Sequence, residues 1–196
     1  MYIFGASGHG KAVIELAEIH SQVDGLVDDN PVHKQLLGYP LIDSLDTVDS
    51  SAQLFIAIGD NRIRRKIFDR LGEVRQYATL IHPSAIISKR CSIGSGTVIM
   101  EGAIVKVAAT VGEQVIVNTS ASIDHDCHVG DFVHLAPGVR LCGGASIGEG
   151  TLVGAGAIIT PYVKVGSWCK ICAGSVVDKD IPDGAKWGGN GLAENG

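Results

Sequence analysis

Aromatic side chains are scarce in this chain of 196 residues, at 5% of the sequence, whereas glycine occurs 26 times. This balance is unusual for a globular core and favours a repeat architecture that is filled by small aliphatic side chains. A disulfide framework is also missing, because the five cysteines are an odd number. We therefore expect a reduced, cytoplasmic setting.

Long apolar runs and an excess of basic charge are missing as well. No segment approaches the roughly 18 apolar residues of a membrane span, and the segment Met1–Gly5 has no basic region or cleavage site of a secretion signal. Charged residues make up 19% of the chain and the net charge is −5. We therefore expect neither a membrane nor a nucleic-acid partner.

A six-residue repeat runs through the second half of the chain. Every sixth position is aliphatic without a break, at Ile87, Ile93, Ile99, Val105, Val111, Val117, Ile123, Val129, Leu135, Leu141, Ile147, Val153, Ile159, Val165, Ile171 and Val177. The residue two positions earlier is small or β-branched throughout, from Ala85 to Ser175. Alternate inward side chains followed by a turn are typical of short strands. The pattern predicts a parallel β-helix from about Ala85 to Val177.

A longer period defines the shape of each coil. Glycine follows the aliphatic residue at every third repeat, at Gly94, Gly112, Gly130, Gly148 and Gly166. Three repeats per coil predict a triangular prism of about five coils, roughly 25 Å tall. We expect these glycines to mark one corner, where the backbone needs a positive φ. A β-sandwich would lack such a fixed phase.

The first third of the chain follows a different pattern. The expected elements are strands at Tyr2–Phe4, Val23–Val27 and Leu54–Ile58 and helices at Lys11–Ile19 and Arg62–Leu71. Alternating strands and helices predict a small Rossmann-like α/β domain over residues 1–82. The β-helix and a C-terminal tail then occupy residues 83–196.

Two features of this first domain favour a nucleotide-linked ligand. The loop Gly5–Gly10 has the order G-x-x-G-x-G, not the dinucleotide fingerprint G-x-G-x-x-G. Backbone N–H groups at a helix N-terminus nevertheless favour a diphosphate, and Asp28 and Asp29 after the second strand suit a ribose or a base edge. A tight turn without a ligand remains the alternative.

One corner of the prism carries the segment Asp124-His125-Asp126. A histidine between carboxylates is a natural general base, as acyl transfer to an amine requires. The backbone N–H groups of Gly143 and Gly144 lie one coil further along and are candidate donors to an oxyanion. A solvated polar corner without chemistry remains open.

Metal and redox chemistry are weaker alternatives. His125, His128 and His134 suggest zinc, but they occupy different phases of the repeat and would not converge in a single chain. Cys169 and Cys172 form one C-x-x-C pair, and the repeat already explains Cys169 as an inward residue. We expect no metal.

Several segments together resemble the bacterial nucleotide-sugar acetyltransferases. The segments are Gly5-Ala6-Ser7-Gly8-His9-Gly10-Lys11, Asp28-Asp29, Ile58-Gly59-Asp60-Asn61-Arg62-Ile63-Arg64, Leu80-Ile81-His82-Pro83, Val117-Asn118-Thr119 and Asp124-His125-Asp126-Cys127. The family includes the UDP-4-amino-sugar N-acetyltransferases of bacillosamine synthesis, perosamine N-acetyltransferases and sialic acid O-acetyltransferases.

The resemblance implies a left-handed β-helix, a homotrimer with active sites between neighbouring prisms, and acetyl-CoA as co-substrate. It makes His125 the general base and Asp126 the residue that raises its basicity. The residues expected to contact acetyl-CoA are Asn118, His134, Gly143, Ala155 and Ala173. Those expected to hold the nucleotide sugar are Gly8, His9, Gly10, Asp28, Asp29, Gly59 and Asn61.

The activity implied is direct transfer of acetyl from acetyl-CoA to the 4-amino group of a UDP-4-amino-4,6-dideoxy sugar. O-acetylation of sialic acid or a related sugar is the alternative, and a non-catalytic nucleotide-sugar-binding protein is a third possibility. Two departures from the family carry expectations. Lys106 replaces a common Asn and should pair with Asp124, and Gly191 replaces a Pro, which should loosen the C-terminal tail.

Overall fold

The computed structural model describes residues 1–29, 31, 34–42, 44–45, 48–49, 51–72, 75–188 and 191–192. The chain divides into two compact units, Met1–Leu80 and Ile81–Gly196. In the described part of the chain, no helix has the length and apolar character needed to cross a bilayer.

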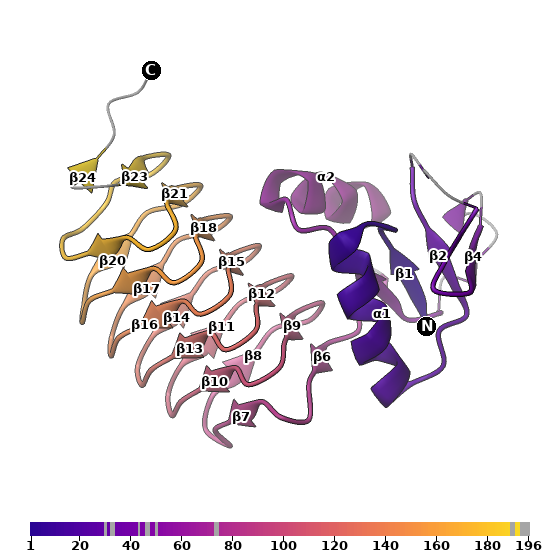
Figure 1. The fold of residues 1–196 in the computed structure, drawn as a ribbon, viewed down its shortest axis with the longest axis horizontal. Helices are drawn as coiled ribbons and strands as arrows, with labels where there is room; N and C mark the ends of the chain where they lie inside the picture. Colours follow the sequence, from indigo (N-terminus) through magenta and orange to yellow (C-terminus); the bar gives the residue numbers. More distant parts are fainter. Residues whose placement is uncertain are drawn as a thin grey trace. The chain divides into compact units, whose positions relative to one another are not determined.

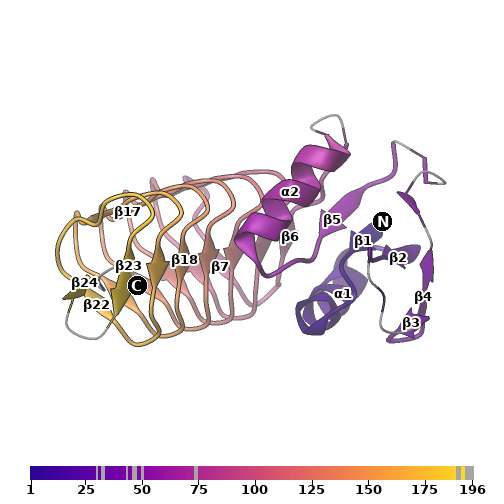
Figure 2. The same cartoon turned by 90° about the horizontal axis from the view of Figure 1, so that it is seen from above.

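The N-terminal unit is built on a five-stranded sheet with the order β3-β4-β2-β1-β5 (Figure 1 and Figure 2). The elements are β1 (Tyr2–Phe4), α1 (Gly8–His20), β2 (Gly25–Val27), β3 (Gln35–Leu36), β4 (Tyr39–Ile42), β5 (Leu54–Ile56) and α2 (Asn61–Leu71). Strands β4, β2, β1 and β5 are mutually parallel. The three expected strands and two helices are therefore all present in this unit.

Two details of this unit differ from the expectation. Helix α1 begins at Gly8, three residues before Lys11, so the glycine-rich loop is also the first turn of the helix. The β3–β4 hairpin was not foreseen from the sequence. Its turn has left-handed residues at Leu37 (φ 50°) and Gly38 (φ 85°), and leucine is not one of the residues that signal such a turn.

The C-terminal unit consists of short strands that repeat along the chain. The strands are β6 (Leu80–Ile81), β7 (Ile86–Ile87), β8 (Ser92–Ile93), β9 (Val98–Ile99), β10 (Ile104–Val105), β11 (Thr110–Val111), β12 (Ile116–Val117), β13 (Ser122–Ile123), β14 (His128–Val129), β15 (His134–Leu135), β16 (Arg140–Leu141), β17 (Ser146–Ile147), β18 (Leu152–Val153), β19 (Ile158–Ile159), β20 (Lys164–Val165), β21 (Lys170–Ile171), β22 (Val176–Val177), β23 (Lys186–Gly188) and β24 (Gly191–Leu192). Each aliphatic position of the predicted series is the second residue of one strand, from β7 to β22.

The strands form three sheets, one for each face of a prism (Figure 2). The first face contains β22-β19-β16-β13-β10-β7, the second β20-β17-β14-β11-β8, and the third β24-β23-β21-β18-β15-β12-β9-β6. Within the repeat, each residue pairs in parallel with the residue eighteen positions on, as in Val105↔Ile123. The parallel β-helix of hexapeptide repeats is therefore confirmed.

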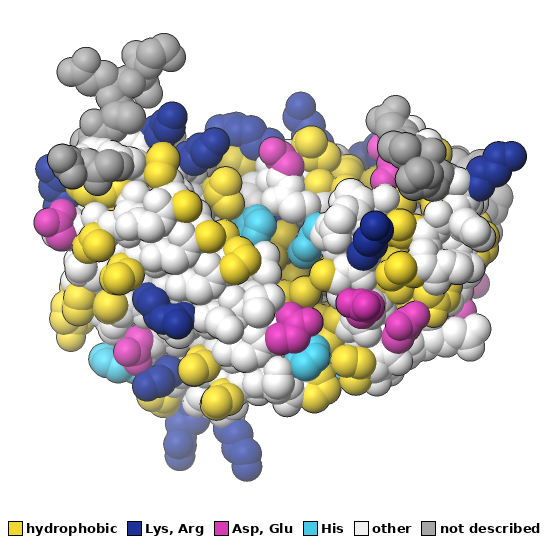
Figure 3. Space-filling view, in the orientation of Figure 1, with side chains coloured by type: hydrophobic (Ala, Val, Ile, Leu, Met, Phe, Trp, Pro, Cys, Tyr) yellow, Lys and Arg dark blue, Asp and Glu magenta, His cyan; other side chains and the backbone are white. Residues whose placement is uncertain are grey.

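The aliphatic series fills the interior of the prism. Ile123, Val129 and Leu135, one from each face of a single coil, are completely buried. The outward strand positions carry polar and charged side chains, such as Ser122 and Arg140, and also exposed aliphatic ones, such as Ile86 and Val176. The molecular surface accordingly shows hydrophobic side chains interspersed with acidic and basic ones (Figure 3). Hydrophobic burial of short side chains therefore holds the coils together.

The predicted reason for the corner glycines was wrong. Gly94, Gly112, Gly130, Gly148 and Gly166 are absent from the positive-φ glycines, and the left-handed residues lie two positions later, for example Gly96 and Gly150. A Cβ on Gly130 would lie 2.8 Å from the backbone nitrogen of Glu149 in the next coil. Close approach of successive coils therefore demands glycine here.

The expected loosening of the C-terminal tail concerns residues that lie mostly outside the described ranges. Within them, Gly191–Leu192 forms β24, which pairs antiparallel with β23.

Candidate active site

His125 and Asp126 occupy the turn between β13 and β14, at one corner of the prism. Nδ1 of His125 lies 2.7 Å from Oδ2 of Asp126. The side chains are 49% and 65% exposed, respectively, so both are open to a ligand. Because an ionised carboxylate only accepts hydrogen bonds, Nδ1 carries the proton and Nε2 is left as the basic nitrogen.

The imidazole of His125 lies directly over Gly143 of the next coil. A Cβ on Gly143 would lie 2.7 Å from both Cε1 and Nε2 of the ring, so no side chain fits beneath it. The N–H of Gly144 donates to the carbonyl oxygen of His125 at 2.9 Å. Gly144 is therefore already engaged and does not serve as the expected oxyanion donor, whereas the N–H of Gly143 has no acceptor among the described residues.

A second contact orders the same corner from the side. The N–H of His125 donates to Oδ1 of Asp124 at 2.7 Å, and Nζ of Lys106 lies 3.8 Å from the same oxygen. The expected pairing of Lys106 with Asp124 is therefore present. Both side chains are partly exposed, so the pair orients Asp124 more than it stabilises the fold.

The three histidines of this region have three different partners. His128 contacts Oγ1 of Thr110 through Nδ1 at 2.7 Å, and Nε2 of His134 lies 3.3 Å from Nδ2 of Asn118. No cluster of three or more His, Cys, Asp or Glu side chains suited to a metal occurs among the described residues.

The cysteines are free thiols with structural positions. Burial raises the pKa of the Cys91, Cys127 and Cys169 thiols. A raised pKa keeps these groups protonated and weakly nucleophilic at neutral pH. They fill the small inward position of the repeat, as its phase predicts.

The residues expected to contact acetyl-CoA fall on two corners of the prism. Asn118, Ala155 and Ala173 lie in turns that follow β12, β18 and β21, which belong to the eight-stranded face. Ala155 and Ala173 are exposed, so this edge is lined by small side chains and bare backbone. Gly143 lies at the other corner, beneath His125. Within one chain these two groups stand at opposite ends of the six-stranded face.

The residues expected to hold the nucleotide sugar lie at one edge of the N-terminal sheet. Gly8, His9 and Gly10 follow β1, Asp28 and Asp29 follow β2, and Gly59 and Asn61 follow β5, and these three strands are adjacent. The N–H of Ala6 donates to Oδ2 of Asp28 at 2.8 Å, which ties the glycine loop to the acidic pair. A Cβ on Gly8 or Gly59 would meet no atom within 4 Å, so both glycines border open space.

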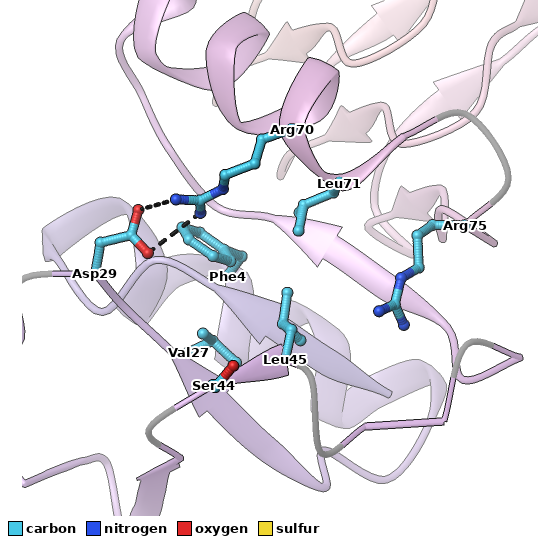
Figure 4. A pocket seen from close by; sticks show the side chains of 8 residues that line it. All are labelled: Phe4, Val27, Asp29, Ser44, Leu45, Arg70, Leu71 and Arg75. Atoms are coloured by element: carbon cyan, nitrogen blue, oxygen red, sulfur yellow. Dashed lines mark hydrogen bonds and ion pairs between the residues drawn. The ribbon is translucent and has the colours of Figure 1, made fainter.

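Asp29 faces a pocket of about 340 Å³ within this unit (Figure 4). Its carboxylate accepts from Nη1 and Nη2 of Arg70 at 2.8 and 3.2 Å. The guanidinium carbon of Arg70 also lies 5.3 Å from the centre of the Phe4 ring. The pocket is lined by Phe4, Val27, Asp29, Ser44, Leu45, Arg70, Leu71 and Arg75. It combines an apolar floor with charged, planar groups, which suits a planar heterocycle.

Arg64 is a residue of this edge that the sequence analysis quoted without a role. It is 1% exposed. Its guanidinium donates to the carbonyl oxygen of Ile58 at 2.7 Å and to Oδ1 of Asn61 at 2.9 Å. Burial lowers its pKa to about 9, while the charge of Asp60 acts in the opposite direction. Arg64 therefore stays charged at neutral pH and holds the loop that carries Gly59 and Asn61. A charged residue on the buried face of a predicted helix was the available signal.

Substitution of Arg64 by methionine is expected to destabilise the N-terminal unit by about 2–4 kcal/mol, because it leaves buried carbonyl groups without donors. Arg65→Met is the matched control, since the Arg65 side chain is 40% exposed and forms an ion pair with Asp69 within the same helix. Both described helices lie in the N-terminal unit, so the helical circular dichroism signal follows its unfolding. Equal unfolding midpoints of Arg64→Met and Arg65→Met would contradict the structural role of Arg64.

Comparison with known proteins connects both units to one family. Residues 1–71 match the model described as PglD N-terminal domain, and residues 144–179 match the bacterial transferase hexapeptide (six repeats). A UDP-N-acetylbacillosamine N-acetyltransferase of Bacillus subtilis is 39% identical over 107 residues, which cover 50% of this chain and 50% of that relative.

Two solved structures align over nearly their full length. The acetyltransferase domain of PglB from Neisseria gonorrhoeae in complex with acetyl coenzyme A is 37% identical, with a TM-score of 0.89 and coverage of 98% of this chain and 97% of that chain. PerB from Caulobacter crescentus in complex with CoA and GDP-perosamine is 35% identical, with a TM-score of 0.91 and coverage of 100% and 96%. The chain therefore belongs to the hexapeptide-repeat family of nucleotide-sugar N-acetyltransferases.

Proposed function

We propose that this protein transfers the acetyl group of acetyl-CoA directly to the 4-amino group of a UDP-4-amino-4,6-dideoxy sugar. The observation that carries the proposal is the pairing of His125 with Asp126 over the bare backbone of Gly143. Such a corner provides a base, its orienting carboxylate and room for a reacting group in one place.

His125 acts as the general base through Nε2. As the amine attacks the thioester carbonyl, the new C–N bond forms, the proton passes to Nε2 and the C–S bond breaks to release CoA. Asp126 keeps the Nδ1 proton in place and stabilises the imidazolium that forms. A base positioned in this way contributes about 10²–10⁴ to the rate.

The N–H of Gly143 is the donor that we assign to the developing oxyanion. It lies in the coil directly beneath the imidazole and is not used by the prism ladder, unlike that of Gly144. A preorganised backbone donor of this kind is typically worth a factor of about 10²–10³ in rate.

The N-terminal unit holds the nucleotide part of the acceptor. The first turn of α1, which contains Gly8, His9 and Gly10, places the positive end of the helix dipole at the diphosphate. Asp28, Gly59 and Asn61 surround the same edge, and Arg64 positions Asn61. The pocket beside Asp29 accepts the base, with Arg70 fixing the orientation of the carboxylate.

Acetyl-CoA lies along the edge formed by Asn118, Ala155 and Ala173, with His134 beside Asn118. This edge and the corner of His125 stand at opposite ends of one face, so a single prism does not bring them together. We propose that the protein is a homotrimer in which the edge of one subunit completes the site of the next.

O-acetylation of sialic acid or a related sugar is the competing activity, because the same base and donor would serve a hydroxyl acceptor. The phosphate-suited helix terminus and the base-sized pocket favour a nucleotide-linked acceptor. A protein that binds the sugar without catalysis would not need the orientation of His125 by Asp126.

The test is thiol release from acetyl-CoA by the purified full chain with three acceptors: a UDP-4-amino-4,6-dideoxy sugar, a GDP-4-amino sugar and free sialic acid. We expect fast release with the UDP-linked amine. Thiol release with sialic acid alone would indicate O-acetylation. No thiol release with any of the three acceptors would contradict the proposed activity.

A further inference from the structure

Tyr162 is an exposed aromatic residue at the same corner as His125. It lies in the turn between β19 and β20, which joins the same two faces as the turn of His125 two coils earlier. The side chain is 74% exposed, the highest exposure among the exposed large hydrophobic residues described. An exposed ring next to a proposed catalytic base invites a functional explanation.

The rings of His125 and Tyr162 lie over consecutive glycines. A Cβ on Gly144 would lie 2.5 Å from Cδ1 of Tyr162, just as a Cβ on Gly143 would meet the ring of His125. A backbone hydrogen bond between the two coils fixes the position of Tyr162, since its N–H donates to the carbonyl oxygen of Gly143 at 3.1 Å. The two rings therefore lie on either side of the coil that carries Gly143 and Gly144, each from a neighbouring coil.

Packing does not account for a tyrosine at this position. Its φ is 62°, in the left-handed region that non-glycine residues generally avoid. This conformation recurs at every sixth position from Gly96 to Gly174, so the repeat itself requires it. At another corner Phe132 is 3% exposed and Trp168 is partly buried, whereas the ring of Tyr162 stays exposed, so packing explains those two rings and not that of Tyr162.

We propose that Tyr162 is an acceptor-binding residue whose ring packs against the amino sugar while His125 faces the amine; this inference rests on the proposed function. A 6-deoxy sugar presents C–H groups and a methyl group, which pack well on an aromatic face. The amine is an ammonium ion before it loses its proton, and an ammonium is attracted to the same face. Tyr162 takes no part in proton transfer.

The test compares Tyr162→Asn and Tyr162→Phe in the full chain. Asparagine tolerates the left-handed backbone, so Tyr162→Asn removes the ring and keeps the corner. We expect the KM for the nucleotide sugar to rise about tenfold, with the KM for acetyl-CoA and the melting temperature unchanged. In Tyr162→Phe, which keeps the ring, the KM for the nucleotide sugar should stay close to that of the parent protein.

Leu37→Asn is the matched control, because Leu37 is also exposed and left-handed but lies in the β3–β4 hairpin. Unchanged acceptor KM in Tyr162→Asn would overturn the inference, as would a loss of activity that accompanies a change of oligomeric state. Failure of the proposed function is recognised separately, because the parent protein would then show no turnover.

Discussion

Replacing His125 with alanine is expected to lower kcat/KM by a factor of about 10² or more, because the change removes the imidazole that accepts the proton of the attacking amine. The melting temperature should remain within a few degrees of the parent value, since the side chain is half exposed and contributes little to the core. Steady-state kinetics with both substrates varied measures the effect.

His128→Ala provides the control for this prediction. His128 is also an exposed histidine with a polar partner, Thr110, and it lies only three residues away on the next face. Its loss should leave the rate near that of the parent. A His125→Ala variant with a near-normal rate would remove His125 from the role of base.

Replacing Gly143 with alanine is the second large effect that we expect. The added methyl group would lie 2.7 Å from the imidazole of His125, and the flexible ring would move away from it. Displacement of a catalytic group by about 1 Å typically costs about 10² in rate. The expected result is therefore a fall in kcat of that order with the fold intact, because a side chain shifts and the backbone does not.

Gly184→Ala separates this steric effect from the general cost of adding a methyl group to a prism corner. Gly184 has φ 70°, and a Cβ there meets nothing within 4 Å, so the change costs backbone strain alone. It should lower the melting temperature slightly and leave kcat unchanged. Similar kcat values for Gly143→Ala and the parent would show that the position of the imidazole over Gly143 is not required.

The β-helix was readable from the sequence because its interior follows one strict rule. Each coil repeats the same inward positions, so an aliphatic residue such as Ile123 or Val129 marks its own strand and its own face. The same phase placed His125 and Asp126 on one corner and Lys106 next to Asp124. Because residues eighteen positions apart lie side by side in adjacent coils, the sequence spacing predicted these contacts.

Other features depend on contacts that spacing does not report. The repeat shows that Gly130 lies at a corner, but only the position of Glu149 in the next coil explains why glycine is required. The phase likewise does not reveal that Gly144 donates to the carbonyl oxygen of His125. Both features depend on how closely one coil approaches the next, and the hexad pattern gives no information on that distance.

The N-terminal unit was less predictable because its edge is assembled from separate segments. Arg64 read as one polar position on a helix, whereas it is buried and hydrogen-bonded to Ile58 and Asn61. The ion pair between Asp29 and Arg70 joins two segments that are distant along the chain. Tertiary placement decides which partners these residues have, and no local pattern encodes those partners.

The measurement that tests the central claim most directly follows the acetyl group itself. The full chain is incubated with acetyl-CoA labelled with carbon-13 in the acetyl group and with a UDP-4-amino-4,6-dideoxy sugar, and the product is examined by NMR. We predict a labelled amide on the 4-amino nitrogen, with no labelled protein when the acceptor is omitted. A labelled ester, or a labelled protein formed without acceptor, would contradict direct transfer to the amine.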